Sequence, residues 1–446
     1  MLSSLFVAPA RRQRIVGLAL PIIGGMVSQN VLNLVDTGMV GTLGDEALVA
    51  VGLGGFLNFV LSAAILGLGA GVQAMSARRV GEGRSADVAV PLNGGLLLAG
   101  LASVPLSGLL IALAPGFVPW FSEDPAVVAT CTPYLQVRLV AMAAMAANVA
   151  FRGFWNATDR SGLYMGTLIV MHAVNIALNW VLIYGHLGAP ALGATGAGVA
   201  SAIATWVGTV SYFILGAKLA RAEGFLGGLP DRETLRTMLR LSVPAGAQQL
   251  FFAGGMTLFI TFIGRVGTAH AAASKVIIDL MLLGILPGLG FGLAAASLVG
   301  QALGRDEPED AERWGWEVAR LAALTVGLLS LPAILVPDRL LGVFLHDAET
   351  LALAEVPLRL VAVFLATDTI GSVLQNACVG AGDTRRIMQV SVSLQWLLLL
   401  PLVYLLGPVL QSSLALLWGA NVLYRQLQAG IFAALWRRGA WKRIEV

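Results

Sequence analysis

Long apolar runs alternate with short polar or Gly/Pro-rich breaks along almost the whole chain. A bilayer core about 30 Å thick needs roughly 20 apolar residues for each helical crossing, and these runs are long enough to supply them. The breaks therefore predict twelve membrane-spanning helices. We expect these helices near residues 15–43, 47–76, 90–119, 126–155, 161–185, 194–219, 241–266, 271–299, 316–337, 350–380, 386–408 and 412–436.

Composition supports this fold class and excludes others. Of the 446 residues, 57% are hydrophobic and only 12% are charged, whereas soluble domains carry about 25% charged residues. The chain is therefore predicted to be an all-α integral membrane protein. No zinc motif, recognition helix or clustered basic domain indicates a nucleic-acid partner, and no P-loop indicates nucleotide hydrolysis. Cys131 and Cys378 fall inside apolar runs and suggest no metal site.

Positive charges predict the orientation of the chain. Loops rich in Lys and Arg stay in the cytoplasm, and an even number of crossings returns the chain to the same side, so both termini are expected to be cytoplasmic. The short apolar stretch before Arg11 precedes the charges, the reverse of the order in a signal peptide, and we expect no cleaved leader. Most of the 28 Lys and Arg residues lie near residues 11–14, 78–84, 152–160, 218–240, 305–320, 385–386 and 437–443.

The second half of the chain repeats the first. Each half holds six predicted helices, and because six is even the repeats run parallel across the membrane. The sequence thus predicts an N-terminal lobe at 1–220, a cytoplasmic linker at 221–240 and a C-terminal lobe at 241–446. The matched positions are Pro21 with Pro244, Gly41 with Gly264, Gly44 with Gly267, Gly67 with Gly290 and Gly81 with Gly304 at an offset of 223, then Pro133 with Pro357 and Asp159 with Asp383 at 224.

Polar side chains within the first predicted helix share one face. Gln29, Asn33 and Asp36 are spaced i, i+4 and i+7, and Asn30 lies beside them. Polar groups inside a membrane helix are costly, so they are functional hypotheses by default. The alternative is a structural polar contact, or a position close to the outer surface.

The fifth predicted helix carries a similar stripe. His172, Asn175 and Asn179 are spaced i, i+3 and i+7, and Ser201 on the sixth helix is placed to extend the group. Together with the first helix they predict a polar cavity in the N-terminal lobe. Asparagines that hydrogen-bond between helices also serve only to hold them together, which is the alternative interpretation.

Charged residues within the apolar runs of the second half number three cations and three anions. Equal numbers of the two signs predict mutual pairing. Asp368 lies deepest among the acids and is a secondary candidate for substrate or proton handling. The six residues are Lys275, Asp279, Glu355, Arg359, Asp368 and Arg425.

These segments resemble the multidrug and toxic compound extrusion (MATE) family over nearly the whole chain. The resemblance is carried by Asn33-Leu34-Val35-Asp36-Thr37, by Asn175-Ile176-Ala177-Leu178-Asn179, and by the paired turns Ala157-Thr158-Asp159-Arg160 and Gly380-Ala381-Gly382-Asp383-Thr384-Arg385. It implies two six-helix bundles in a V shape that export cationic or amphipathic small molecules in exchange for H⁺ or Na⁺. It also implies a plasma (inner) membrane transporter surrounded by lipid, expected to function as a monomer, with no cofactor and no enzymatic activity.

The carboxylate of the first helix looks more like the DinF-type subgroup, since Phe259 stands opposite Asp36 in the repeat alignment. The resemblance implies that Asp36 is the coupling aspartate. It places Gln29, Asn175, Asn179 and Ser201 around it, with Asn148 as a weaker match. Some relatives carry a second acid at the position of Asn179, so a sodium site at Asp36, Asn175, Asn179 and Ser201 is expected to be weak.

Protons are therefore the predicted coupling ion. Burial in low dielectric disfavours the charged form of Asp36, and the neutral carboxyl can donate a hydrogen bond to Asn175 or Asn179. Pro21 removes one backbone hydrogen bond, and so offers a place where the first helix can bend when the carboxyl is neutralised.

The sequence disfavours two other functions. A flippase for lipid-linked precursors has similar hydropathy, but Arg138 is the one intramembrane cation that the sequence predicts for the first lobe, which disfavours an anionic lipid cargo. An intramembrane aspartyl protease would need a Tyr-Asp pair besides Gly380-Ala381-Gly382-Asp383, and the sequence has none. The sequence does not name the substrate, because promiscuous cavities are built from adaptable surfaces.

The orientation gives a first prediction. Residues 78–90, 220–240 and 301–315 should face the cytoplasm, because they hold most of the loop cations outside the termini. Single cysteines placed in these loops should resist a membrane-impermeant reagent in intact cells and react after lysis. Strong labelling from outside intact cells would overturn the orientation.

Overall fold

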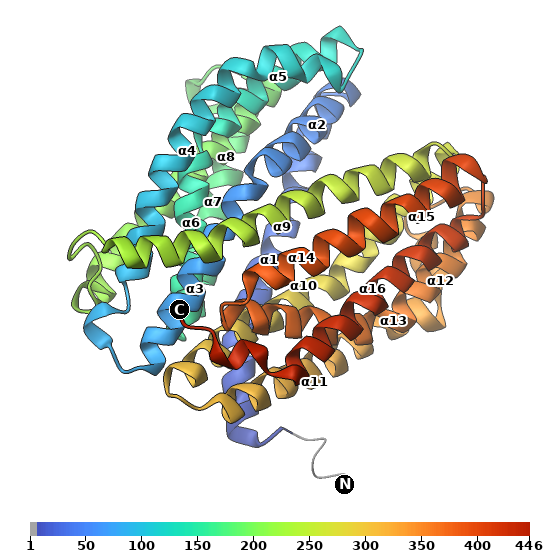
Figure 1. The fold of residues 1–446 in the computed structure, drawn as a ribbon. Coiled ribbons are helices and arrows are strands. Elements are labelled where there is room, and N and C mark those ends of the chain that lie inside the picture. The colour runs from blue at the N-terminus through green and yellow to red at the C-terminus, as the bar shows by residue number, and fades with distance from the viewer. Residues whose placement is uncertain (1–6) are drawn as a thin grey trace. The chain divides into compact units, whose positions relative to one another are not determined.

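The computed structural model describes residues 7–446, and every regular element within that range is helical. Most of the apolar stretch before Arg11, on which the expectation about a leader rests, lies outside it. The long helices connect through short turns (Figure 1). They are α1 Pro9–Gly41, α2 Asp45–Ser62, α3 Gly67–Gly81, α4 Val90–Phe117, α5 Pro125–Val140, α6 Met142–Ala157, α7 Ser161–Tyr184, α8 Gly193–Leu219, α9 Arg232–Gly264, α10 Thr268–Gly304, α11 Pro308–Leu335, α13 Ala348–Gly380, α14 Thr384–Ser393 and α16 Leu414–Arg438.

The helices agree with the apolar runs, but fewer of them meet the length and hydropathy expected of a membrane span. Ten segments of residues 7–446 are long and apolar enough, and α5 with α6 makes an eleventh if this pair, bent by 48°, is one span. The twelfth predicted span corresponds to α16. This helix is 25 residues long, but Arg425 and neighbouring amides such as Gln426 and Gln428 lower its hydropathy.

Residue contacts divide the chain into two compact units. One comprises Gly24–Gly246, and the other comprises Ala247–Val446 together with the residues up to Ile23. We call them the Asp36 unit and the Asp368 unit. Both divisions fall within a continuous helix, α1 and α9, two residues after Pro21 and Pro244 respectively. The two dividing points are also 223 positions apart, which is the offset of the sequence repeat.

Glycines bring helix backbones together inside the Asp36 unit. A Cβ on Gly153 of α6 would lie 2.4 Å from the carbonyl oxygen of Gly69 in α3. A Cβ on Gly67 would lie 2.3 Å from the backbone nitrogen of Gly246. Small residues allow such approach in membrane helices, where van der Waals packing replaces the hydrophobic driving force.

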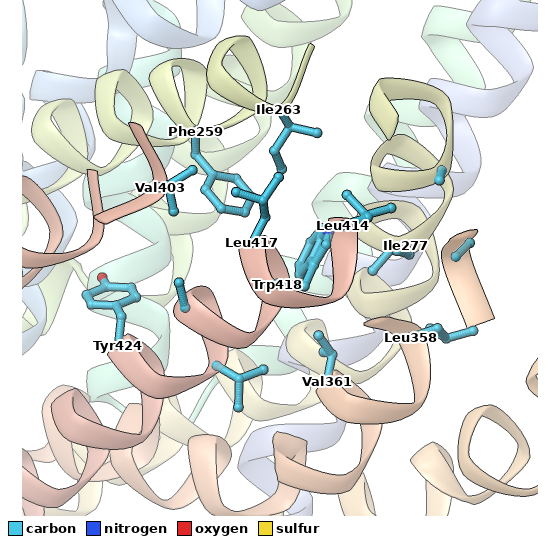
Figure 2. Packing of buried hydrophobic residues seen from close by; sticks show 14 of the residues in the cluster. Phe259, Ile263, Ile277, Leu358, Val361, Val403, Leu414, Leu417, Trp418 and Tyr424 are labelled. Carbon is cyan, nitrogen blue, oxygen red and sulfur yellow. The ribbon is translucent and has the colours of Figure 1, made fainter. Parts of the chain in front are cut away.

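The Asp368 unit has an extensive apolar core between α9, α10, α13, α16 and the helical segment at 394–406 (Figure 2). Phe259 meets Trp418 edge to face, with ring centroids 5.5 Å apart. The indole nitrogen of Trp418 donates to the hydroxyl of Ser274 at 3.1 Å, so the ring is buried without leaving its polar atom unpaired.

The glycine contacts give a second prediction. Gly153→Ala should lower the stability of the purified protein by about 1–3 kcal/mol, because its methyl group has no room against the α3 backbone. Gly100→Ala in α4 is the control, since nothing lies within 4 Å of its new methyl group. The control should keep or raise stability by up to about 1 kcal/mol through helix propensity. Thermal unfolding in detergent measures both, and equal melting temperatures would contradict the packing argument.

Candidate functional site

Polar side chains from α1, α7 and α8 meet inside the Asp36 unit. The Asn179 amide of α7 donates to Oδ1 of Asp36 in α1 at 2.6 Å. Asn179 is fully buried and Asn175, one turn earlier on α7, is 2% exposed. The predicted association of the acid with the fifth predicted helix is thus present as a direct hydrogen bond.

Asn175 lies between the acid and α8. The orientation of its amide that satisfies both neighbours turns the nitrogen toward Asp36 Oδ1 at 2.8 Å and the oxygen toward the Ser201 hydroxyl at 3.1 Å. In this orientation two amide donors converge on one carboxylate oxygen, which is the environment an ionised acid requires when it is buried. Asp36, Asn175, Asn179 and Ser201 thus form one hydrogen-bonded group, which we call the Asp36 network.

Two buried polar atoms beside this network have no hydrogen-bond partner within residues 7–446. They are Oδ1 of Asn179 and Nε2 of His172. His172 is 8% exposed and lies on the same helix, one turn before Asn175. Buried polar groups are normally paired, so the unmatched acceptor of Asn179 indicates a place that a donor or a cation can occupy.

The other predicted members lie outside the network. Gln29 donates to Asn33 Oδ1 at 3.3 Å, and both side chains are exposed on α1. Asn30 is half-buried, and it makes no hydrogen bond with any residue that the structure describes. The Asn148 amide instead connects α6 to α8, donating to the Thr205 carbonyl at 3.1 Å. Sharing a helical face with Asp36 therefore does not bring Gln29 or Asn33 to its partners on α7.

A pocket opens beside Ser201 in the same unit. Arg138 lines it and is near enough to Asp36 for their opposite charges to interact. Asn58 and Thr205 line it too and are not among the residues that the sequence predicts for the site. Asn58 could have been found as a lone amide in the apolar run of the second predicted helix. The pocket is lined by Asn58, Arg138, Ala141, Met142, Met145, Ser201, Ala202 and Thr205.

Three of the four positions equivalent to the Asp36 network are apolar in the second repeat. Phe259 corresponds to Asp36 at the offset of 223, and at 224 Leu399 and Val403 correspond to Asn175 and Asn179. All three belong to the buried apolar core of the Asp368 unit, where Figure 2 shows Phe259 and Val403 side by side. The fourth member, Ser201, corresponds at 224 to Arg425, so the second repeat has no counterpart of the carboxylate and its two asparagines.

The predicted pairing of the charges in the second half is confirmed. Asp368 accepts from Arg425 at 2.7 Å, and the same guanidinium donates to Gln428 at 3.3 Å. The side chains of Asp368 and Arg425 are 13% and 26% exposed, so this pair is the most enclosed of the three. The other two pairs are Lys275 with Asp279 at 2.5 Å and Arg359 with Glu355 at 3.0 Å.

The sequence also predicts no metal site apart from a weak sodium site, and a place where the first helix can bend at Pro21. Within residues 7–446 no three His, Cys, Asp or Glu side chains cluster in a way that could hold a metal ion. A cation at the Asp36 network would depend on one carboxylate and neutral oxygens. Pro21 lies inside α1, which is continuous from Pro9 to Gly41, so this structure describes the helix without a break at the proline.

Comparison with known proteins gives a consistent family match. The family model described as MatE matches residues 21–181 and again 244–405, once in each repeat. The "Probable multidrug resistance protein NorM" of Pseudomonas aeruginosa is 28% identical over 94% of this chain and 86% of its own length. Its namesake in Xanthomonas campestris pv. campestris is 30% identical over 86% of this chain and 85% of its own length.

Solved structures share the fold. One described as the outward-facing conformation of a multidrug resistance MATE family transporter of the MOP superfamily has a TM-score of 0.88 at 22% identity, and covers 98% of this chain and 97% of its own. A MOP superfamily transporter from Pyrococcus furiosus has a TM-score of 0.87 at 22% identity, with the same coverage.

The ion pair of Asp368 with Arg425 gives a third prediction. Arg425→Met should destabilise the protein by about 3–5 kcal/mol, because it leaves the Asp368 carboxylate buried without its partner. The double variant with Asp368→Leu and Arg425→Leu should recover most of that loss. Arg305→Met, which breaks a more exposed pair with Glu307 in the same unit, should cost at most about 1 kcal/mol. Thermal unfolding compares the three, and no difference between Arg425→Met and Arg305→Met would contradict a structural role.

Proposed function

This chain belongs to the MatE family, whose members are transporters rather than enzymes, and we propose that it exports organic compounds in exchange for protons through Asp36. Its relatives with the name multidrug resistance protein support multidrug efflux of small molecules. The observation that carries the proposal is the hydrogen-bonded Asp36 network of one carboxylate, two asparagines and Ser201.

The two charge states of Asp36 suit different neighbours. Ionised, the carboxylate accepts from both asparagine amides and attracts a cationic group of the substrate. Protonated, it gains a donor of its own, and the unpartnered Oδ1 of Asn179 is an acceptor in the same amide group. Protonation therefore removes the attraction for the cation and changes the hydrogen bonds of the network together.

Exchange follows from competition for one group. An organic cation binds the ionised form of Asp36, and a proton converts it to the neutral form. Binding of either therefore lowers the affinity for the other. A proton that arrives from the outer side releases the cargo there, and loss of that proton to the cytoplasm restores the empty, ionised site. We assign the accompanying bend of α1 to Pro21, whose ring removes one helical hydrogen bond.

The finer assignments are part of the same proposal. Twelve crossings, with α16 as the last, place both termini in the cytoplasm according to the charged loops. The chain is assigned to the plasma (inner) membrane, as a monomer without a cofactor. Phe259 at the repeat position of Asp36 supports the DinF-type subgroup.

Sodium is the main alternative to the proton. Na⁺ would need several oxygen ligands, and the Asn179 oxygen and Asp36 are available for it. The position of Asn179 supplies an amide rather than a second carboxylate, which favours the proton. A lipid-linked precursor flippase is less well supported, because one arginine, Arg138, faces the pocket of the Asp36 unit.

The fourth prediction tests the coupling. Purified protein in sodium-free liposomes should move the cationic dye rhodamine 123 when a pH gradient is applied, and Asp36→Asn should reduce the initial rate at least tenfold. Asp306→Asn is the control, because this exposed loop aspartate has a left-handed backbone conformation that asparagine also tolerates. Transport that requires a sodium gradient and ignores pH would contradict the proton assignment.

A further inference from the structure

We propose that the pocket at the break between α5 and α6 binds a carboxylate, so that the transporter accepts zwitterionic compounds whose cationic group lies toward Asp36. Arg138 is the charged partner of that carboxylate. The inference rests on the proposed function, because it names a substrate class for the same cavity.

The pocket lies at a break in the helical backbone. α5 ends at Val140 and α6 begins at Met142, with a bend of 48° between them. No side chain caps the start of α6, although Ala141 and Met142 both line the pocket. Irregular backbone within a membrane is tolerated where it lines a cavity, and the first amides of a helix favour an anion.

Two side chains independently point to an anionic ligand. The Arg138 side chain lines the pocket and makes no hydrogen bond or ion pair within residues 7–446. Asn58 of α2 lines it too, is only 7% exposed, and has no hydrogen-bond partner in that range either. Both can donate, and a guanidinium presents paired donors that match the two oxygens of a carboxylate.

Size and charge select the ligand class. Only eight residues line the pocket, and so small a lining fits a head group rather than a whole molecule. Ser201 belongs both to this pocket and to the Asp36 network, so the two charged residues flank a shared polar surface. With Asp36 ionised, the acid and Arg138 together carry no net charge. A zwitterion gives each of the two charges an opposite charge of its own.

The remaining walls allow different scaffolds to be attached to that head group. Met142 and Met145 lie along the pocket, and unbranched thioether side chains adapt to irregular apolar surfaces. The specificity is thus for the charge pair rather than for one molecular shape.

A matched pair of dyes tests the inference. Rhodamine 110 carries a free carboxylate, and rhodamine 123 is its cationic methyl ester. Fluorescence anisotropy with the full-length protein in nanodiscs should show that Arg138→Gln weakens binding of rhodamine 110 relative to rhodamine 123 by at least tenfold, the effect of losing a charged hydrogen bond. Arg138→Lys should retain most of the discrimination, and Arg152→Gln, which removes a cation elsewhere on α6, should leave it unchanged. Acetate added alone should displace rhodamine 110 more than rhodamine 123.

The outcomes separate this inference from the proposed function. Equal weakening of both dyes by Arg138→Gln, or no weakening of either, overturns the carboxylate site, as does equal displacement by acetate. If Arg138→Gln elutes as aggregate in size-exclusion chromatography, Asn58→Leu takes its place, and the same unequal loss of rhodamine 110 binding is required. Failure of the wild type to transport either dye under a pH gradient counts against the proposed efflux function, while the binding ratio still decides the site.

Discussion

The cost of an unpaired polar group in a low-dielectric interior governs the structure. It explains why Arg425 is paired with Asp368, and why the Trp418 indole reaches Ser274. The same cost makes buried polar atoms without a hydrogen-bond partner informative. The buried Asn179 oxygen is left without a partner within residues 7–446, next to the carboxylate on which the proposed function depends.

The chain contains two copies of one six-helix repeat, and only the first copy has the carboxylate on which the proposed function depends. Asp36 and Asn179 occupy positions that Phe259 and Val403 fill in the other repeat. An apolar core in the second copy stabilises that unit with no need for a ligand. The first copy has the Asp36 network in place of this apolar packing, and in the proposed function its hydrogen bonds change when a proton or a substrate binds.

The helices were predictable because each follows a local apolar run, and the duplication because matched residues recur at a fixed offset. The pairing of charges in the second half was predictable because cations and anions are equal in number there. The network was predictable in part. The α7 spacing correctly grouped Asn175 with Asn179, whereas Gln29 shares a face with Asp36 on α1 but stays exposed, since helical phase does not state which neighbour a face meets. Arg138 was visible as a lone cation, yet its pocket depends on the bend at Ala141, where neither glycine nor proline signals a break.

The exchange of helix segments between the compact units bears on how each unit is completed. Residues up to Ile23 group with the second repeat, and residues 232–246 of α9 group with the first, at equivalent points of the duplication. A single six-helix half with this connectivity would lack the leading segment that completes its unit, so each compact unit is assembled from both halves of the duplication.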